Sequence, residues 1–181
     1  MSGTPTVTAS GGMFTVTDAQ GNKTTVDLGT LMMMLNLERT ENLDNQIAVQ
    51  MQEIMDRNTQ IEQLTELMMW ARDQKANGKN DQNVTINGVT KPAATWAAEL
   101  GVPWVDPGPK PSKSDDIDAW NAKWDTNIQN IKSQLDMLNN DSQVANIELQ
   151  NLLEKRGNAF EMATKVMDTN NQSVQSILRN L

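Results

Sequence analysis

Residues 128–177 read IQNIKSQLDMLNNDSQVANIELQNLLEKRGNAFEMATKVMDTNNQSVQSI, and small or apolar side chains recur in them at alternating spacings of three and four. Read as heptads abcdefg, the stretch has a positions at Ile128, Leu135, Ser142, Leu149, Arg156, Ala163, Asn170 and Ile177. Its d positions are Ile131, Leu138, Ala145, Leu152, Ala159, Val166 and Ser173. The spacing predicts one uninterrupted helix, on the order of 75 Å long, that packs as a coiled coil.

The composition restricts the classes of function. The chain of 181 residues contains no histidine, no cysteine and no tyrosine. It therefore lacks the side chain best suited to proton transfer at neutral pH, the thiol nucleophile and the usual zinc ligands. We expect no enzyme, no cofactor and no metal site. The net charge of −8 argues against nucleic acid as a partner, because a basic patch is the expected footprint of such proteins.

The N-terminal segment, residues 1–27, is rich in Ser, Thr and Gly and carries no charged side chain before Asp18. Residues 13–17 and 23–26 alternate in the manner of two strands around a turn at Gly21, which predicts a β-hairpin. A disordered tail is the alternative, and both interpretations stay open. The segment has no basic stretch followed by an apolar one, so we do not expect a Sec-type signal peptide.

A first long helix is expected from Leu28, with Asp27 as its cap, to about residue 76. Its apolar stripe consists of Leu31, Leu35, Leu43, Ile47, Met51, Ile54, Ile61, Leu64 and Met68. Asn58 falls on the same stripe. A polar residue at such a position costs stability but can select the register of a helix pair.

The periodicity disappears between residues 77 and 114. Residues 84–89 predict a short strand and turn, and residues 92–100 predict one or two helical turns closed by Gly101. Pro103, Pro107, Pro109 and Pro111 then exclude continuous helix. A second helix is expected from residue 115, after Ser114 as N-cap. The segments are thus 1–27, 28–76, 77–114 and 115–181.

The expected fold is mainly α: a long antiparallel helical hairpin or coiled coil with a small irregular α+β head insert. Five tryptophans lie in or beside that insert and are expected to form its core, namely Trp70, Trp96, Trp104, Trp120 and Trp124. No tryptophan lies in the distal part of either helix.

The last part of the second helix carries apolar e positions beside the a/d seam, which are Leu153, Phe160, Met167 and Val174. The earlier e positions are polar: Lys132, Asn139 and Asn146. A two-helix hairpin needs only a narrow seam, so the wider stripe indicates packing against a further neighbour. That neighbour is either another subunit or a third segment of this chain, such as the N-terminal tail.

The segment Leu31-Met32-Met33-Met34-Leu35 begins a run that is apolar on all faces of a helix. Methionine adapts to irregular surfaces and is common at interfaces that repack. One interpretation is a turn buried by the end of the second helix. Because one helix cannot cover every face, the other interpretation is that an oligomer or a chaperone covers the rest.

Polar residues recur on the a line at Ser142, Arg156 and Asn170. They either specify register or lie on solvated faces of a loosely packed helix pair. If Leu31 lies beside Ile177, the numbers of facing residues add to roughly 208. Arg156 would then lie near residue 52, and the nearest carboxylate is that of Glu53. An arginine at an a position otherwise has to extend out of the seam. We therefore predict that Glu53 and Arg156 form a partly buried ion pair that sets the register, and removing one partner of such a pair is costly.

The residues also suggest a family. Residues 149–162 (LQNLLEKRGNAFEM) and 176–181 (SILRNL) resemble the C-terminal helix of type III secretion needle-tip and filament proteins, and residues 31–58 resemble their N-terminal helix. The resemblance is to self-polymerising tip-filament proteins and, more distantly, to EspA-like filament subunits. It covers about half of the chain and contains no catalytic motif.

The resemblance implies a secreted virulence protein that forms a homopolymer on the bacterial cell surface, where it is a conduit for effectors. It implies export through an uncleaved N-terminal signal. The implied partners are the secretion needle, translocator proteins, a cytoplasmic secretion chaperone and further copies of the chain. The alternative is a soluble coiled-coil adaptor or chaperone-like binding protein. The expected self-association residues are Leu31, Met32, Met33, Met34, Leu35, Leu153, Phe160, Met167, Val174, Ile177 and Leu181.

Overall fold

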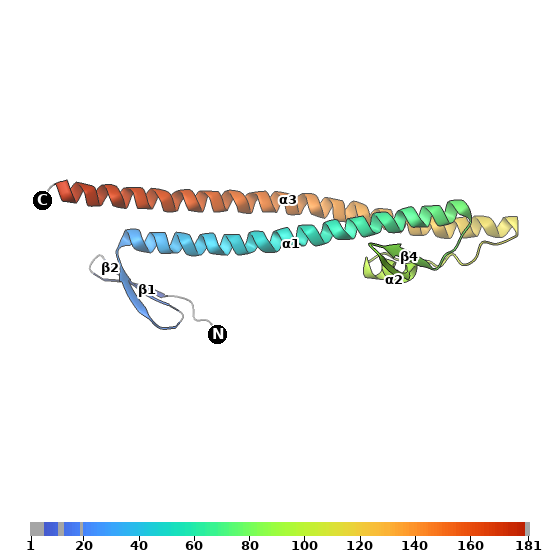
Figure 1. The fold of residues 1–181 in the computed structure, drawn as a ribbon, viewed down its shortest axis with the longest axis horizontal. Coiled ribbons are helices and arrows are strands. Elements are labelled where there is room, and N and C mark those ends of the chain that lie inside the picture. The colour runs from blue at the N-terminus through green and yellow to red at the C-terminus, as the bar shows by residue number, and fades with distance from the viewer. Residues whose placement is uncertain (1–5, 11–12, 19, 180–181) are drawn as a thin grey trace. The chain divides into compact units, whose positions relative to one another are not determined.

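The computed structural model describes residues 6–10, 13–18 and 20–179, without the side chains of 115, 170, 171, 173, 174 and 176–179. The protein is mostly helical, and the long helix α1 packs on α3 beside two small antiparallel sheets, as the mainly α prediction requires (Figure 1). The elements in chain order are β1 (Thr6–Ser10), β2 (Met13–Thr17), β3 (Lys23–Val26), α1 (Leu28–Asn77), β4 (Asn83–Ile86), β5 (Val89–Pro92), α2 (Ala93–Glu99) and α3 (Ser114–Arg179).

The chain divides into two compact units. Unit 1 consists of residues 1–49 and 149–181, and unit 2 consists of residues 50–148. Both long helices therefore contribute to both units, but the elements that accompany them differ.

In unit 1, the strands form a sheet of order β1-β2-β3 with antiparallel pairs. Val7 is paired with Val16 and Phe14 with Val26, so one face of the sheet is apolar and the other carries mostly threonines. The pairing of β2 with β3 confirms the predicted hairpin, and the disordered-tail alternative is wrong for the described residues of 13–26. Strand β1 was not predicted, because its small and polar side chains are all exposed and give a weak periodic signal.

The loop between β2 and β3 is organised by Asp18. Its carboxylate accepts hydrogen bonds from the Asn22 side chain at 2.9 Å and from the backbone N–H groups of Asn22 and Gln20 at 2.8 and 2.9 Å. The bonds from Asn22 and from the loop backbone hold the pKa of Asp18 below its ordinary value. Helix α1 follows, and the Asp27 side chain accepts from the N–H of Thr30 at 2.7 Å, as a cap should.

In unit 2, two turns shape the segment between the long helices. The turn between β4 and β5 consists of Asn87 and Gly88, with φ values of 48° and 76°, which a two-residue hairpin of this hand requires. Helix α2 ends at Glu99, and Gly101 follows two residues later with a φ of 72°. The N–H groups of Val102 and Gly101 donate to the carbonyls of Ala97 at 2.7 Å and Ala98 at 3.2 Å, which closes the helix in a Schellman motif.

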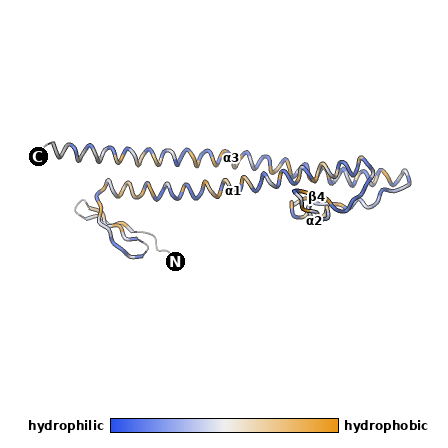
Figure 2. The backbone as a smooth tube through the Cα atoms, viewed as in Figure 1, coloured by the Kyte–Doolittle hydropathy of each residue, from blue (hydrophilic) through white to orange (hydrophobic). Residues whose placement is uncertain are grey.

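The hydrophobic core lies in unit 2. It combines both long helices with β4 and α2, and its fully buried side chains include Leu64, Leu67, Ile86, Trp124 and Ile131. Figure 2 shows that hydrophobic and hydrophilic residues alternate along both long helices. The prediction for the tryptophans is confirmed: Trp96, Trp120 and Trp124 are buried in this core, and Trp70 and Trp104 pack against it.

Side-chain amides attach the proline-rich segment to α3. Asn127 is completely buried, accepts from the N–H of Val105 at 2.8 Å and donates to the Val105 carbonyl at 2.7 Å. Asn130 donates to the carbonyl of Pro103 at 2.9 Å, and the Trp120 indole donates to that of Gly108 at 2.9 Å. These bonds satisfy backbone groups that the prolines prevent from joining a helix or sheet.

The predicted a/d seam of α3 is confirmed over the described side chains. Every such position is buried or half-buried except Arg156. The stripe predicted on α1 is correct at Leu43, Ile47, Ile54, Ile61, Leu64 and Met68, and Leu31 is also buried. It is wrong at Leu35 and Met51, which are exposed, whereas the neighbouring Asn36 is buried and Gln50 is half-buried.

The predicted register is wrong. In unit 2, Lys75 pairs with Asp125, and Gln50 donates to Glu148 at 3.3 Å; in unit 1, Arg156 pairs with Asp44. The numbers in each pair add to about 200 rather than 208, a shift of about two helical turns.

Glu53 consequently has a different partner from the one predicted. It pairs within its own helix with Arg57 at 3.4 Å, and Asn58 is exposed rather than in the seam. The prediction matched the apolar ends of the two helices, but several apolar side chains at the start of α1 face outward, so they do not align the pair. The side chain of Asn170 lies outside the described residues.

Candidate self-assembly surface

The apolar e positions of α3 in unit 1 are exposed. Leu153, Phe160 and Met167 keep 48%, 68% and 52% of their surface open, whereas the adjacent d residue Ala159 keeps 1%. The e side chains therefore lie next to the a/d seam but are not buried in it. The alternative that the N-terminal segment covers them is wrong for the part of that segment that the structure describes.

The same row of α3 is polar in unit 2. Lys132, Asn139 and Asn146 are exposed there. The change from polar to apolar at exposed e positions thus coincides with unit 1. Scattered exposed apolar residues are ordinary, but a row of them on one helix indicates a binding surface.

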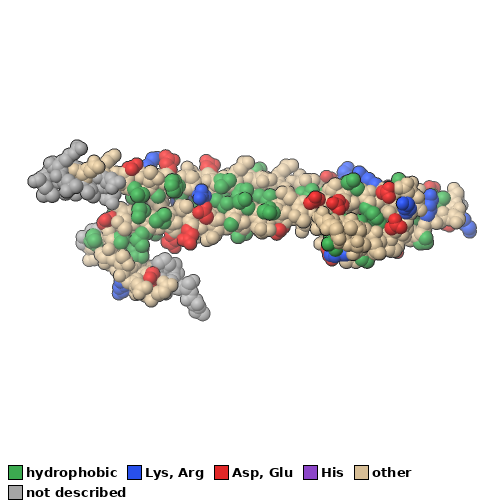
Figure 3. Space-filling model, viewed as in Figure 1, with side chains coloured by type: hydrophobic (Ala, Val, Ile, Leu, Met, Phe, Trp, Pro, Cys, Tyr) green, Lys and Arg blue, Asp and Glu red, His purple; other side chains and the backbone are tan. Residues whose placement is uncertain are grey.

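Further exposed apolar side chains lie on the long helices in both units. Figure 3 shows hydrophobic side chains gathered along the visible face of these helices, and in unit 2 Val144 and Ile147 are 56% and 58% exposed. Met162 on α3 is 48% exposed, and Leu37 and Val49 on α1 are 57% and 60% exposed. Leu37 belongs to the run that the sequence showed to be apolar on all faces, whereas Met162 and Val49 were missed because they fall outside the predicted apolar stripes. Their exposure could only be recognised once the seam was located.

The methionine-rich start of α1 is covered on one side only. Leu31 is buried and Met33 is half-buried, but Met32, Met34 and Leu35 are exposed. The interpretation that the end of α3 buries this turn is therefore wrong.

The N-terminal sheet leaves an open apolar groove over this turn. The groove has a volume of about 490 Å³ and is lined by Val7, Val16, Leu31, Met34, Leu35 and Leu37, with the acidic Asp18, Glu38 and Glu41 around them. An amphipathic helix or strand with basic residues is the kind of ligand that such a groove suits.

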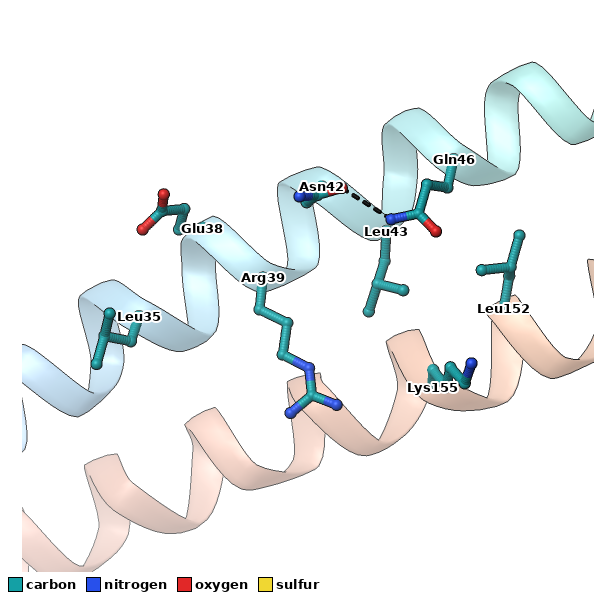
Figure 4. A pocket seen from close by; sticks show the side chains of 8 residues that line it. All are labelled: Leu35, Glu38, Arg39, Asn42, Leu43, Gln46, Leu152 and Lys155. Carbon is teal, nitrogen blue, oxygen red and sulfur yellow. Dashed lines mark hydrogen bonds between the residues drawn. The ribbon is translucent and has the colours of Figure 1, made fainter. Parts of the chain in front are cut away.

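A second groove lies between α1 and α3 in unit 1, with a volume of about 460 Å³ (Figure 4). Leu35, Arg39 and Leu43 line it from α1, and Leu152 and Lys155 line it from α3. On its α1 side, the Gln46 amide donates to Asn42 at 2.8 Å. The groove means that the two helices of unit 1 are not closely packed along this part of the seam.

The polar a positions differ in their environments. The Ser142 hydroxyl is buried in unit 2 and has no hydrogen-bond partner in the described part of the chain. Arg156 is exposed, and its pair with Asp44 leaves about half of each side chain in water. Arg156 therefore lies on a solvated face, which was one of the two interpretations of the polar a residues.

Some expected residues fall outside the described part. The side chains of Val174 and Ile177, and the residue Leu181, are not described. The described self-association candidates split into two sets: Leu31 to Leu35 at the start of α1, and Leu153, Phe160 and Met167 on α3.

The described residues, 6–10, 13–18 and 20–179, give no indication of a metal site or of a membrane-spanning helix. No group of three or more acidic residues is arranged to hold a metal ion there. None of the helices described is long and apolar enough to cross a membrane.

Comparisons with known proteins add no assignment. No protein-family model, no curated protein and no solved structure matches this chain. The surface is therefore interpreted from its own residues.

Proposed function

We propose that this chain is a structural subunit that assembles with copies of itself through the exposed apolar residues of α3 in unit 1. The single observation that carries the proposal is the exposure of Phe160 and Met167 at e positions beside the a/d seam. Burying apolar surface contributes about 25 cal/mol per Å², and large side chains of this kind contribute about 1.5–3 kcal/mol each when fully buried.

In this proposal, α1 and α3 form a long antiparallel hairpin with coiled-coil packing, and residues 77–114 form an exposed head. The pairs Lys75–Asp125, Gln50–Glu148 and Asp44–Arg156 support the antiparallel direction. The hairpin leaves the e row free, so neighbouring copies complete the packing of unit 1. The head packs β4 and α2 onto the same two helices, so unit 2 already has a closed core.

The assembly we propose is an extracellular tip or filament on a bacterial type III secretion needle, which serves as a conduit for effector delivery. The likeness of residues 149–162 and 31–58 to such proteins supports this assignment. The partners in this setting are the secretion needle, the translocator proteins and a cytoplasmic secretion chaperone. The chaperone would shield the apolar row before export.

A second candidate function is that of a soluble coiled-coil adaptor or chaperone-like binding protein. The apolar groove between the N-terminal sheet and the start of α1 favours it, because such a groove accommodates an amphipathic segment of another protein. The two candidate functions differ in the assemblies that they predict: the first predicts long polymers of one chain, and the second predicts small complexes.

The deciding experiment compares two double variants by sedimentation velocity, electron microscopy and circular dichroism. Phe160→Asp with Met167→Asp places two charges on the apolar row, and we expect loss of polymer with helicity retained. Asn151→Asp with Asn158→Asp is the matched control, because it adds the same charge at exposed c positions of the same helix segment. We expect the control to polymerise normally.

Three outcomes reject the self-assembly surface. The first is unchanged polymer length in the Phe160 and Met167 variant. The second is equal loss in the control, which would indicate a general charge effect. The third is loss of helicity together with polymer, which would place the two residues in the subunit core. Small complexes of the unmodified chain at high concentration would favour the adaptor function.

The export signal is testable separately. We expect that removing residues 1–12, with a new start methionine, leaves a helical protein in the cytoplasm of a secreting strain, because this deletion spares β2, β3 and α1. Secretion at the normal level would place the signal elsewhere.

A further inference from the structure

A small cavity in unit 2 combines aromatic and acidic side chains. It has a volume of about 90 Å³, which corresponds to about three water molecules. Trp70 and Trp104 line it together with the carboxylates Asp81 and Asp106. The rest of the lining is largely proline and alanine. Neither self-assembly nor the hairpin requires this cavity.

The two indoles are held in place by the core. Their ring centroids lie 6.3 Å apart with the planes tilted by 35°, and each ring meets Trp124 edge-on at 5.8 or 6.0 Å. Both side chains are half-buried, so part of each remains open to the cavity. The aromatic part of the cavity is therefore preorganised, which lowers the entropic cost of binding.

The two carboxylates are also positioned. Asp81 accepts from the Gln74 amide at 3.1 Å, and its own N–H donates to Gln74 at 2.8 Å. Asp106 accepts from the N–H of Gly108 at 2.9 Å. Neither carboxylate has a cationic partner among the residues that the structure describes. The cavity thus carries negative charge that the described part of the chain does not balance.

The same unit shows how these groups combine when an ammonium is present. The Lys91 ammonium lies 4.5 Å from the centre of the Trp96 ring and 2.6 and 2.8 Å from the two oxygens of Glu99. Another ammonium, that of Lys110, lies 6.0 Å from the Trp120 ring. The cavity is lined by the same two kinds of group, indoles and carboxylates.

We propose that this cavity binds an organic cation of the trimethylammonium class. Cation–π attraction is strongest over tryptophan, and quaternary ammonium groups are bound by aromatic walls of this kind. A methylated cation donates no hydrogen bond, so it can lie against the proline and alanine lining without leaving a donor unsatisfied. Its charge is balanced by Asp81 and Asp106.

The first test titrates the full-length chain with choline at constant ionic strength, below the concentration at which it self-associates. The indole N–H signals are followed by NMR, and Trp104→Phe assigns the signal of Trp104. We expect saturable shifts of the Trp70 and Trp104 signals. The neutral isostere 3,3-dimethylbutan-1-ol should bind at least about tenfold more weakly, because it lacks the cationic charge.

The second test removes the charge of the cavity without changing its shape. Asp81→Asn with Asp106→Asn should weaken choline binding by about tenfold or more. Asp136→Asn with Asp141→Asn is the matched control, since both residues are exposed on α3 in the same unit and neither lines the cavity. The control should bind choline as the unmodified chain does.

Four results would overturn the proposal: no saturable shift, equal binding of the neutral isostere, shifts confined to Trp96 and Trp120, or unchanged affinity in the Asp81 and Asp106 variant. Co-sedimentation with phosphatidylcholine vesicles identifies the source of the ligand. Co-sedimentation assigns the cation to a lipid headgroup, and binding of free choline without co-sedimentation assigns it to a soluble molecule. Both assignments are independent of self-assembly.

Discussion

Units 1 and 2 use the same two helices in different ways. In unit 2, β4 and α2 pack onto the pair, and Leu64, Leu67 and Ile131 lose all contact with water. In unit 1, the e row of α3 is apolar and keeps Phe160 and Met167 exposed, whereas the same row is polar in unit 2. The difference teaches that a helix pair buries only its narrow seam, and that a wider apolar face needs a further element. Unit 2 obtains that element from its own chain, and we infer that unit 1 obtains it from other copies.

The largest expected effect comes from one substitution made in each unit. Leu64→Ala removes a completely buried side chain of unit 2, whereas Leu43→Ala removes one that is 7% exposed and borders an open groove in unit 1. We expect Leu64→Ala to lower the free energy of unfolding by about 3–4 kcal/mol, because a cavity remains in a closed core. Leu43→Ala should cost about 2 kcal/mol, since its site is already partly open.

Chemical denaturation of dilute protein, followed by circular dichroism, measures both effects. Leu43 and Leu64 lie on the same helix, so helix propensity changes equally in the two variants. Equal costs, or a larger cost for Leu43→Ala, would mean that unit 1 is as well packed as unit 2.

Much of the helical architecture was predictable, because it rests on local signals. The a/d spacing of α3, the cap at Asp27 and the Asn87-Gly88 turn each follow from residues close together in the chain. The tryptophans indicated the location of the core for a similar reason, since large aromatic side chains are rarely left in water.

The register was not predictable in this way. Asn36 and Gln50 occupy seam positions on α1, and Gln50 reaches the carbonyl of Ala145 at 3.5 Å and the Glu148 carboxylate. A search for apolar residues selects Leu35 and Met51 instead, which face outward. Which neighbouring residue enters the seam depends on packing against a distant segment, so the sequence pattern alone could not identify it.

The candidate sites were also predictable from the sequence only in part. The wider apolar row at Leu153, Phe160 and Met167 followed from heptad arithmetic. The cavity between Trp70 and Trp104 did not, because its carboxylates, Asp81 and Asp106, come from separate loops. No spacing in the sequence brings these groups together.

A smaller effect on the free energy of unfolding is expected from a substitution of Ser142, a polar residue in the seam of unit 2. Its buried hydroxyl has no partner in the described part of the chain, so Ser142→Ala should stabilise the protein by about 1 kcal/mol. Ser133→Ala is the matched control, because Ser133 is exposed on the same helix and reports the gain in helix propensity alone.

Thermal unfolding measures the difference between the two serine variants. A midpoint for Ser142→Ala that is no higher than that of the control would show that the hydroxyl makes a favourable interaction. Altered assembly of Ser142→Ala would show that this serine specifies the register or the number of partners.

The smallest effect is expected at the ion pair of unit 1. Asp44 and Arg156 leave about half of each side chain in water, so their coupling should be about 0.2–1 kcal/mol. A double-mutant cycle with Asp44→Ala and Arg156→Ala measures it in dilute protein. A parallel cycle with Glu53→Ala and Arg156→Ala should be additive within about 0.5 kcal/mol. Coupling in the second cycle and none in the first would restore the register expected from the apolar ends.

The central claim is that other copies complete unit 1, and amide hydrogen exchange tests it most directly. Exchange is measured by mass spectrometry on the unmodified chain, once at a concentration that keeps it monomeric and once at a high concentration. We predict that α1 residues 28–49 and α3 residues 149–169 exchange faster than the unit 2 core in the monomer and become strongly protected at high concentration. Exchange in residues 61–71 and 120–138 should change little. Unchanged exchange in unit 1, or protection gained only in unit 2, would contradict the account.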